Sequence, residues 1–303
     1  MVANRPDPAA PPKDHPDDEE RAVTTTQNPA IGKSAEANGI RTNYLEAGEG
    51  SGQGDKDVVL IHGSGPGVTS YANWRLVLPV LAENFHVVAP DMVGFGYSDR
   101  PDKVSYSLDT WADQTLGLMD TLGIEKANLV GNSFGGGIAL RIATRHPDRV
   151  GKLVLMGSMG VHFPITEGLD AVWGYDGTLA GMRTVLDYFA YSRELVNEEL
   201  AQVRYQGANE PGFQEAFSSM FPAPRQRWVE AMMVAEAEIR SLPHRALIVH
   251  GREDQVIPLA NSFKLMELLD KADLAVFSHC GHWSMIERTA DFNRLVRDFF
   301  LGD

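Results

Sequence analysis

Short apolar runs that recur between helical segments are the feature that most constrains the fold of this chain. Six such runs are predicted to be β-strands, and they cover residues 58–61, 86–90, 127–130, 152–156, 246–250 and 274–277. Residues 58–61 are apolar at every position, so both faces of that strand must be buried. Residues 108–122 show helical spacing of their apolar side chains, and Ser107 can cap that helix. Alternating strands and helices predict an α/β fold, with a mostly parallel sheet and helices on both faces.

The strand pattern stops between residues 161 and 242, where helical patterns and bulky aromatic side chains predominate. A stretch of this length is too long for a loop inside a compact domain. We therefore predict a helical lid over 161–242, inserted into a core that comprises 37–160 and 243–303.

Residues 1–36 are predicted to be a disordered tail. The segment is rich in proline, carries an acidic run at 17–20 and precedes the first aromatic residue, Tyr44. Such a composition cannot bury enough apolar surface to offset the conformational entropy lost on ordering. The alternative is an arm that docks on the core.

Composition excludes several classes of function. Lys and Arg number 27 against 41 Asp and Glu, which gives a formal net charge of −14. Nucleic acids and anionic membranes attract Lys and Arg, so neither is expected as a partner. The single cysteine, Cys280, cannot form an intrachain disulfide or a multi-cysteine metal site. We expect no transmembrane helix and no signal peptide, and we therefore expect a cytoplasmic protein. We also expect the protein to form a homo-oligomer, namely a dimer.

The strongest local signal for chemistry is the motif Gly131–Asn132–Ser133–Phe134–Gly135. It follows a predicted strand and precedes a predicted helix, which is the context that the G-x-S-x-G pattern requires. The glycines permit a sharp turn that exposes the Ser133 hydroxyl at the sheet edge. Ser133 is therefore the candidate nucleophile, and the alternative is a glycine-rich turn with an incidental serine.

A serine nucleophile needs a base, and the base needs an acid that orients it. Asp254 follows the fifth predicted strand and His282 follows the sixth. Carboxyl ends of parallel strands meet at one sheet edge, so Ser133, Asp254 and His282 are predicted to converge as a catalytic triad. Glu253 is the rival acid, Asp254 could instead cap a turn, and His282 could instead be a structural core histidine.

Glycines in residues 62–67 follow the first predicted strand and let the backbone approach a substrate closely. The backbone N–H groups of Ser64 and Phe134 are predicted to form an oxyanion hole. A dinucleotide-binding loop is the alternative, but Pro66 removes an N–H and the G-x-G-x-x-G spacing is absent. Cys280 is expected to be a packed residue rather than a nucleophile.

Several motifs together resemble one known family. They are HGSGPG at 62–67, ANWR at 72–75, GNSFGGG at 131–137, CGHW at 280–283, and the stretches 165–175 and 221–228. From about Gly39 onward the chain resembles α/β-hydrolases of the meta-cleavage product hydrolases, in their monocyclic branch. The resemblance implies an α/β-hydrolase fold with an inserted helical lid. It also implies cleavage of the C5–C6 carbon–carbon bond of 2-hydroxy-6-oxo-2,4-dienoates, such as 2-hydroxymuconate semialdehyde or short 6-alkyl analogues, from aromatic-compound degradation.

The resemblance further implies roles for residues beyond the triad. Arg204 would hold the substrate carboxylate, Asn73 and Asn132 would contact its polar atoms, and Trp283 and Phe189 would line the pocket. The small-molecule dienoate would be ketonised and then attacked by the serine, with no metal and no cofactor.

Two alternatives remain open for the reaction and for Arg204. A carboxylesterase could use the same triad, and a catalytically idle ligand-binding homologue is a further possibility.

Arg204 lies on an apolar helical stripe with Leu200 and Val203, where its guanidinium could bind a buried carboxylate. The alternative is an ion pair with Glu199. We expect small C6 substituents to be preferred, because bulky lid residues could crowd the pocket; these are Trp173, Phe189, Phe221 and Trp228.

Overall fold

The computed structural model describes residue 1, residues 28–49 and residues 56–302. The predicted tail therefore lies outside the described residues between positions 2 and 27. Within the part that is described, no helix has the length and apolar character needed to cross a membrane.

One eight-stranded sheet forms the centre of the molecule, in the order β1-β2-β4-β3-β5-β6-β7-β8. Its strands are β1 (Lys33–Ala37), β2 (Ile40–Ala47), β3 (Asp57–Ile61), β4 (His86–Pro90), β5 (Ala127–Asn132), β6 (Val150–Met156), β7 (Ala246–Gly251) and β8 (Ala272–Phe277). Strand β2 pairs antiparallel with β1 and with β4, and all the other pairs are parallel. The predicted mostly parallel α/β sheet is confirmed, and all six predicted strands are present.

Thirteen α-helices are found in the described residues. They are α1 (Ser70–Trp74), α2 (Leu78–Leu81), α3 (Leu108–Thr121), α4 (Phe134–Arg145), α5 (Glu167–Trp173), α6 (Leu179–Phe189), α7 (Glu198–Ala208), α8 (Phe213–Met220), α9 (Gln226–Ala231), α10 (Glu236–Arg240), α11 (Leu259–Leu268), α12 (Ser284–Glu287) and α13 (Thr289–Leu301). The 3-10 turn Pro147–Arg149 leads into β6. The predicted cap of α3 is confirmed, because the Ser107 hydroxyl accepts a hydrogen bond from the Thr110 N–H at 3.2 Å.

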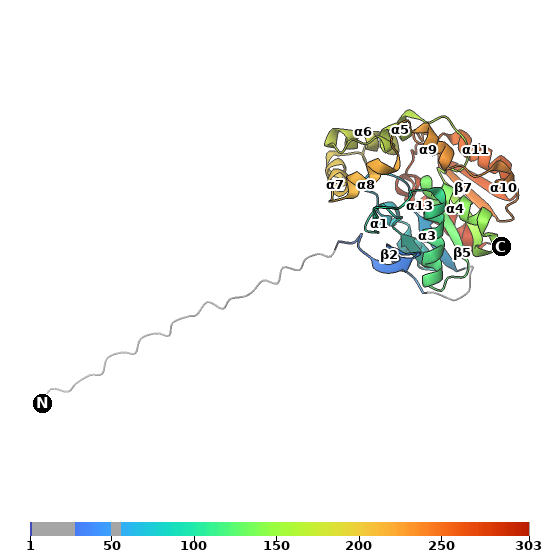
Figure 1. The fold of residues 1–303 in the computed structure, drawn as a ribbon, viewed down its shortest axis with the longest axis horizontal. Helices are drawn as coiled ribbons and strands as arrows, with labels where there is room; N and C mark the ends of the chain where they lie inside the picture. The colour runs from blue at the N-terminus through green and yellow to red at the C-terminus, as the bar shows by residue number, and fades with distance from the viewer. Residues whose placement is uncertain (2–27, 50–55, 303) are drawn as a thin grey trace.

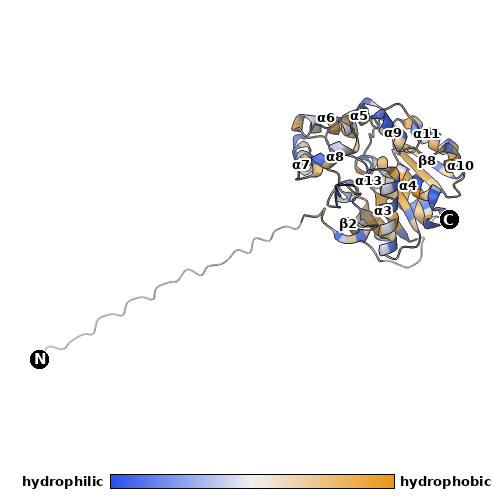
Figure 2. Ribbon diagram, in the orientation of Figure 1, coloured by the Kyte–Doolittle hydropathy of each residue, from blue (hydrophilic) through white to orange (hydrophobic). Residues whose placement is uncertain are grey.

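The hydrophobic core is built around the central strands. Every residue of β3, β4, β5 and β7 is buried, as expected for strands that are covered on both faces. Figure 2 shows hydrophobic residues concentrated in these central strands. The edge strand β8 is only partly buried.

Helices α5 to α10 lie between β6 and β7, in the region predicted to be a lid. In Figure 1, α5 to α8 gather at one side of the molecule, away from the sheet. Helix α10 instead contacts α4 and α11, which flank the sheet. We therefore use the name helical insertion for α5 to α9, and the limits 161–242 of a separate lid stay a prediction.

The predicted boundary of the tail at residue 36 is wrong, because Lys33–Ala37 forms the edge strand β1. This strand pairs with β2 through a two-residue turn in which Asn38 and Gly39 both have positive φ (51° and 77°). Asn-Gly is the preferred sequence for such a hairpin turn. The prediction failed because β1 is mostly polar and exposed, so its apolar pattern is weak.

The β1–β2 hairpin predicts that removal of β1 from the chain lowers its thermal stability. A chain that begins at Asn38 loses β1 and also two partners of the buried Asn43 side chain, the Gly32 N–H at 2.9 Å and the Ala30 carbonyl at 3.0 Å. Each lost hydrogen bond is worth about 1 kcal/mol, so we expect the melting temperature to fall by roughly 4–10 °C. A chain that begins at Asn28 is the matched control, and it should melt within about 2 °C of the full chain. Equal melting temperatures for both truncations, measured by calorimetry, would contradict this role of β1.

Candidate active site

Ser133 lies in the sharp turn between β5 and α4, at the N-cap of α4. Its backbone has φ 55° and ψ −114°, a conformation that non-glycine residues rarely adopt. A Cβ on Gly131 would lie 2.4 Å from the Gly135 carbonyl oxygen, and one on Gly135 would lie 2.2 Å from the Ile61 carbonyl oxygen. Both motif glycines are therefore required for the turn that presents the Ser133 side chain.

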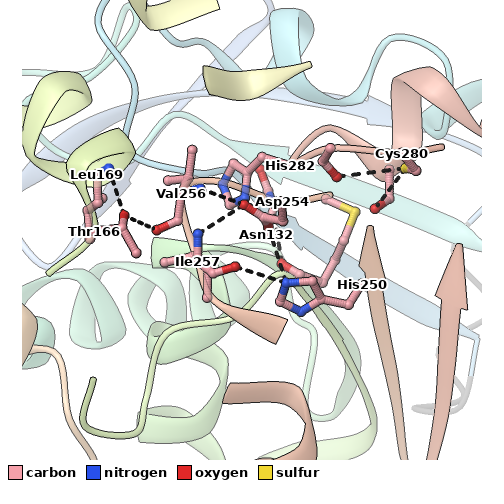
Figure 3. Close-up of polar contacts among 12 residues, drawn as sticks. Asn132, Thr166, Leu169, His250, Asp254, Val256, Ile257, Cys280 and His282 are labelled. Carbon is pink, nitrogen blue, oxygen red and sulfur yellow. Dashed lines mark hydrogen bonds and ion pairs between the residues drawn. The ribbon is translucent and has the colours of Figure 1, made fainter. Parts of the chain in front are cut away.

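Asp254 and His282 meet at the carboxyl ends of β7 and β8 (Figure 3). His282 Nδ1 lies 2.7 Å from Asp254 Oδ2, and both side chains are buried. The other carboxylate oxygen, Oδ1, accepts hydrogen bonds from the N–H groups of Val256 and Ile257 at 2.8 and 2.9 Å. The rival acid Glu253 contacts Arg252 and the Cys280 N–H instead. Asp254 is thus the carboxylate that orients His282.

His250 is a third member of this buried group that the sequence analysis missed. Its Nε2 lies 3.3 Å from Asp254 Oδ2, and its Nδ1 lies 2.6 Å from the Ser262 hydroxyl. Burial acts to raise the pKa of the Asp254 carboxyl, but the charge of His282 and the hydrogen bonds from both histidines outweigh it and hold the pKa well below its usual range. Asp254 therefore remains ionised at neutral pH and can hold the His282 imidazole in a fixed orientation.

A cavity of about 340 Å³ opens in front of Ser133 and His282. All five residues predicted to bind substrate line it, and so does one of the two predicted for the oxyanion hole: Asn73, Asn132, Phe189, Arg204 and Trp283, with Ser64. Of the four aromatic residues expected to crowd this space, only Phe189 is among the lining side chains. The rest of the apolar wall includes Leu169, Val172, Val256 and Ile286. This volume suits a small ligand.

Arg204 has no carboxylate partner within the described residues. No ion pair joins it to Glu199, although both side chains line the cavity, and its buried Nε has no hydrogen-bond partner. The guanidinium lies 5.4 Å from the centre of the Trp283 ring. Burial, with a smaller contribution from the Arg75 cation, lowers the pKa of Arg204 to about 10, so the side chain stays charged at neutral pH. A cation in this state is suited to bind an anionic ligand.

The backbone N–H groups of Ser64 and Phe134 make no hydrogen bond to another described residue. Phe134 is the first residue of α4, where the N–H groups of a helix have no intrahelical partner. Ser64 lies on the cavity wall. Phe134 is buried and is not among the residues that line the cavity, but its N–H, like that of Ser64, is not taken up by another described residue.

Cys280 is buried, as expected for a packed residue. Burial raises the pKa of its thiol to about 12, so the reactive thiolate is scarce at neutral pH. Among the described residues, no group of His, Cys, Asp or Glu side chains is arranged to hold a metal ion.

Glu287 is a second residue that the sequence analysis missed. Its Oε2 accepts hydrogen bonds from the N–H groups of Tyr191 and Ser192, both at 2.9 Å, and its Oε1 accepts one from the Gly281 N–H at 2.7 Å. Glu287 thus ties the turn after α6 to the residue that precedes His282. No sequence signal marks this role, because its partners are backbone groups and two of them are about 95 residues away.

The contacts of Glu287 predict the effect of removing its charge. In Glu287→Gln, the side-chain amide must place an N–H group against one or more backbone N–H donors, so the loop before His282 should shift. We expect kcat to fall about 10-fold and the melting temperature to fall by a few degrees. Glu267→Gln on the exposed face of α11 is the control and should change neither. Unchanged kcat in Glu287→Gln would show that this carboxylate does not position the loop.

Comparison with known proteins places the chain in a family. The model of the α/β hydrolase fold family matches residues 57–289. The chain is 58% identical over 272 residues to a 2-hydroxymuconate semialdehyde hydrolase from Pseudomonas sp. strain CF600, covering 90% of this chain and 94% of the relative. It is 51% identical to a 2-hydroxy-6-oxo-2,4-heptadienoate hydrolase from Pseudomonas putida, covering 92% and 99%.

Solved structures agree with these sequence relatives. A meta-cleavage product hydrolase from Pseudomonas fluorescens IP01, in a mutant form complexed with acetates, superposes with a TM-score of 0.88 at 56% identity, covering 90% of this chain and 98% of that one. The chain therefore belongs to the α/β hydrolase fold family. Within that family it is a member of the meta-cleavage product hydrolases.

Proposed function

We propose that this protein hydrolyses the C5–C6 carbon–carbon bond of 2-hydroxy-6-oxo-2,4-dienoates, with 2-hydroxymuconate semialdehyde and short 6-alkyl analogues as substrates. One observation carries the proposal: a charged arginine, Arg204, which has no carboxylate partner in the described part of the chain, shares a small cavity with Ser133 and His282. An esterase for neutral substrates has no need of such a cation. Relatives at 50–58% identity bear the names of hydrolases for such substrates.

The proposed binding mode uses the polar groups at the cavity wall. Arg204 holds the substrate carboxylate, and Asn73 and Asn132 contact its oxygen atoms. The buried Nδ2 of Asn73 has no partner among the described residues, so it is free to donate to the substrate. Phe189 and Trp283 stack on each other with ring centres 4.8 Å apart and form an apolar wall beside the diene.

The first chemical step is ketonisation of the bound dienol. The C2 hydroxyl loses its proton, the double bonds shift, and a proton is delivered to C5. His282 is the proton carrier, since it lines the cavity and is held by Asp254. The product of this step is a 2,6-dioxo compound in which C5 is saturated.

The second step is attack by Ser133 on the C6 carbonyl, with His282 accepting the hydroxyl proton. The resulting oxyanion accepts hydrogen bonds from the Ser64 and Phe134 N–H groups. The C5–C6 bond then breaks, its electron pair passes to the dienolate, and His282 returns a proton to the leaving fragment. Water activated by His282 hydrolyses the acyl-enzyme, which releases a carboxylic acid and restores Ser133.

We also propose that the protein is cytoplasmic and acts as a homodimer. The single buried cysteine, which has no disulfide partner, is consistent with a reducing compartment. Three exposed apolar side chains, Phe263 and Met266 on α11 and Val276 on the edge strand β8, mark a surface that a second copy would cover. Sedimentation equilibrium tests the dimer, and a monomer at micromolar concentration would contradict it.

The role of Ser133 predicts the effect of its removal. Ser133→Ala should fold normally and lose about 10³-fold or more in kcat, because no other group in the cavity replaces the nucleophile. A fluorophosphonate should label the wild type and spare Ser133→Ala. Ser241→Ala on the exposed end of α10 is the control and should keep full activity. Turnover at the wild-type rate by purified Ser133→Ala would refute covalent catalysis by this residue.

The role of Arg204 and the size of the cavity predict substrate preference. We expect kcat/KM to differ modestly between the semialdehyde and the methyl ketone, since one methylene is worth ~1–3 kcal/mol, and to fall strongly for the phenyl ketone, which overfills the site. Arg204→Ala should lower kcat/KM about 10- to 100-fold for all three, because they share the carboxylate end.

The control for this comparison is Arg183→Ala, which removes an exposed arginine of α6 that pairs with Glu198. It should leave all three kcat/KM values unchanged. If the phenyl ketone is the best substrate, the preference for small C6 groups is wrong. If Arg204→Ala has no effect on any substrate, the anchoring role is wrong.

A further inference from the structure

The helical insertion packs directly on the loop that carries the Ser64 N–H group. The indole Nε1–H of Trp173 in α5 donates a hydrogen bond to the Ser64 hydroxyl oxygen at 2.9 Å. A Cβ on Gly65 would lie 3.3 Å from the Phe189 ring of α6, and one on Gly67 would lie 2.6 Å from the Ala208 backbone of α7. Three helices of the insertion therefore contact three neighbouring positions of one loop.

The contact made by Trp173 is the only polar one of these three. An indole N–H is a donor only, and Ser64 is its partner. The Trp173 ring is buried and stacks on Phe221, with ring centres 4.4 Å apart and an interplanar angle of 7°. Trp173 is not among the residues that line the cavity. Its position is thus set by packing inside the insertion rather than by contact with a ligand.

We propose that Trp173 is a positioning residue that holds the oxyanion loop in place through the Ser64 side chain. The inference rests on the proposed function, in which the Ser64 N–H stabilises the oxyanion. Such a donor is effective only when it lies about 2.7–3.1 Å from the position of the developing charge. Anchoring the Ser64 side chain restricts rotation of the same residue's backbone. The insertion thereby sets the geometry of the catalytic centre as well as the shape of the pocket.

The test is a double-mutant cycle. Trp173→Phe removes the N–H donor and keeps an aromatic ring against Phe221, whereas Ser64→Ala removes the acceptor and keeps the backbone N–H. We expect each single variant to lower kcat about 10-fold with KM within about twofold, since the loss falls on the transition state. The double variant should be no slower than either single variant, because all three lack the same hydrogen bond.

A matched control is available in the same insertion. Trp228 also donates its indole N–H, to the Pro222 carbonyl at 2.8 Å, and its ring also contacts Phe221, but it contacts neither Ser64 nor the cavity. Trp228→Phe should therefore keep the wild-type kcat. Melting temperatures of all variants report whether folding is preserved, and Ser64→Ala alone tests the proposal if Trp173→Phe does not fold.

Any of three results would overturn the proposal. The first is a wild-type kcat in Trp173→Phe or in Ser64→Ala. The second is a double variant whose fold-loss in kcat equals the product of the two single losses, and the third is a rise in KM with kcat unchanged.

Each variant is measured on the semialdehyde and on 4-nitrophenyl acetate, a neutral ester that uses the oxyanion hole without the Arg204 contact. If the wild-type enzyme cleaves the ester and not the semialdehyde, the proposed function is refuted. The kcat values of the variants on the ester would still decide whether Trp173 positions the oxyanion loop.

Discussion

The strained turn at Ser133 is the constraint on which the rest of the site depends. A non-glycine residue in this backbone conformation costs about 1–3 kcal/mol, and the surrounding structure has to hold it. The Ser133 N–H donates to the Met156 carbonyl at 2.8 Å, and Gly135 packs against the backbone of Ile61. Strands β3, β5 and β6 are therefore fixed relative to one another at the point where Ser133, the proposed nucleophile, emerges. Asp254 and His282 follow the next two strands of the same parallel sheet.

The cavity is less negative than the molecule as a whole. The chain carries a formal net charge of −14, which repels an anionic dienoate at long range. Arg204 and Arg75 both line the cavity and supply the opposite charge locally. Glu194 and Glu199 also line the cavity, so the formal charges of these four side chains cancel. Because charges in salt solution act over about 8 Å, an anionic ligand is attracted chiefly close to Arg204, which has no carboxylate partner among the described residues.

The sequence allowed the parallel strands, the Ser133 turn and the convergence of Asp254 and His282 to be predicted, because each depends on local pattern and on the geometry of parallel sheets. The strand β1 was missed because polar edge strands show little apolar periodicity, although Asn38 and Gly39 marked its turn. Glu287 was missed because two of its partners come from a segment about 95 residues away. His250 was missed although its partners lie only 4–12 residues further along the chain, because the apolar pattern of a strand does not show which polar side chain meets the loop that follows it. The orientation of Trp173 was also beyond prediction, since helical spacing does not tell which buried face borders a cavity.

The main chain of Phe189, the last residue of α6, supports the loop that carries His282. Its carbonyl oxygen accepts hydrogen bonds from the N–H groups of His282 and Trp283, at 2.8 and 3.3 Å. Any amino acid at position 189 supplies the same carbonyl, so this support for the histidine loop does not depend on residue identity. A substitution at this position changes the ring contacts with His282 and Trp283 and keeps both main-chain hydrogen bonds. Substitution at position 189 would therefore reshape the pocket and keep the main-chain support of the loop that carries His282.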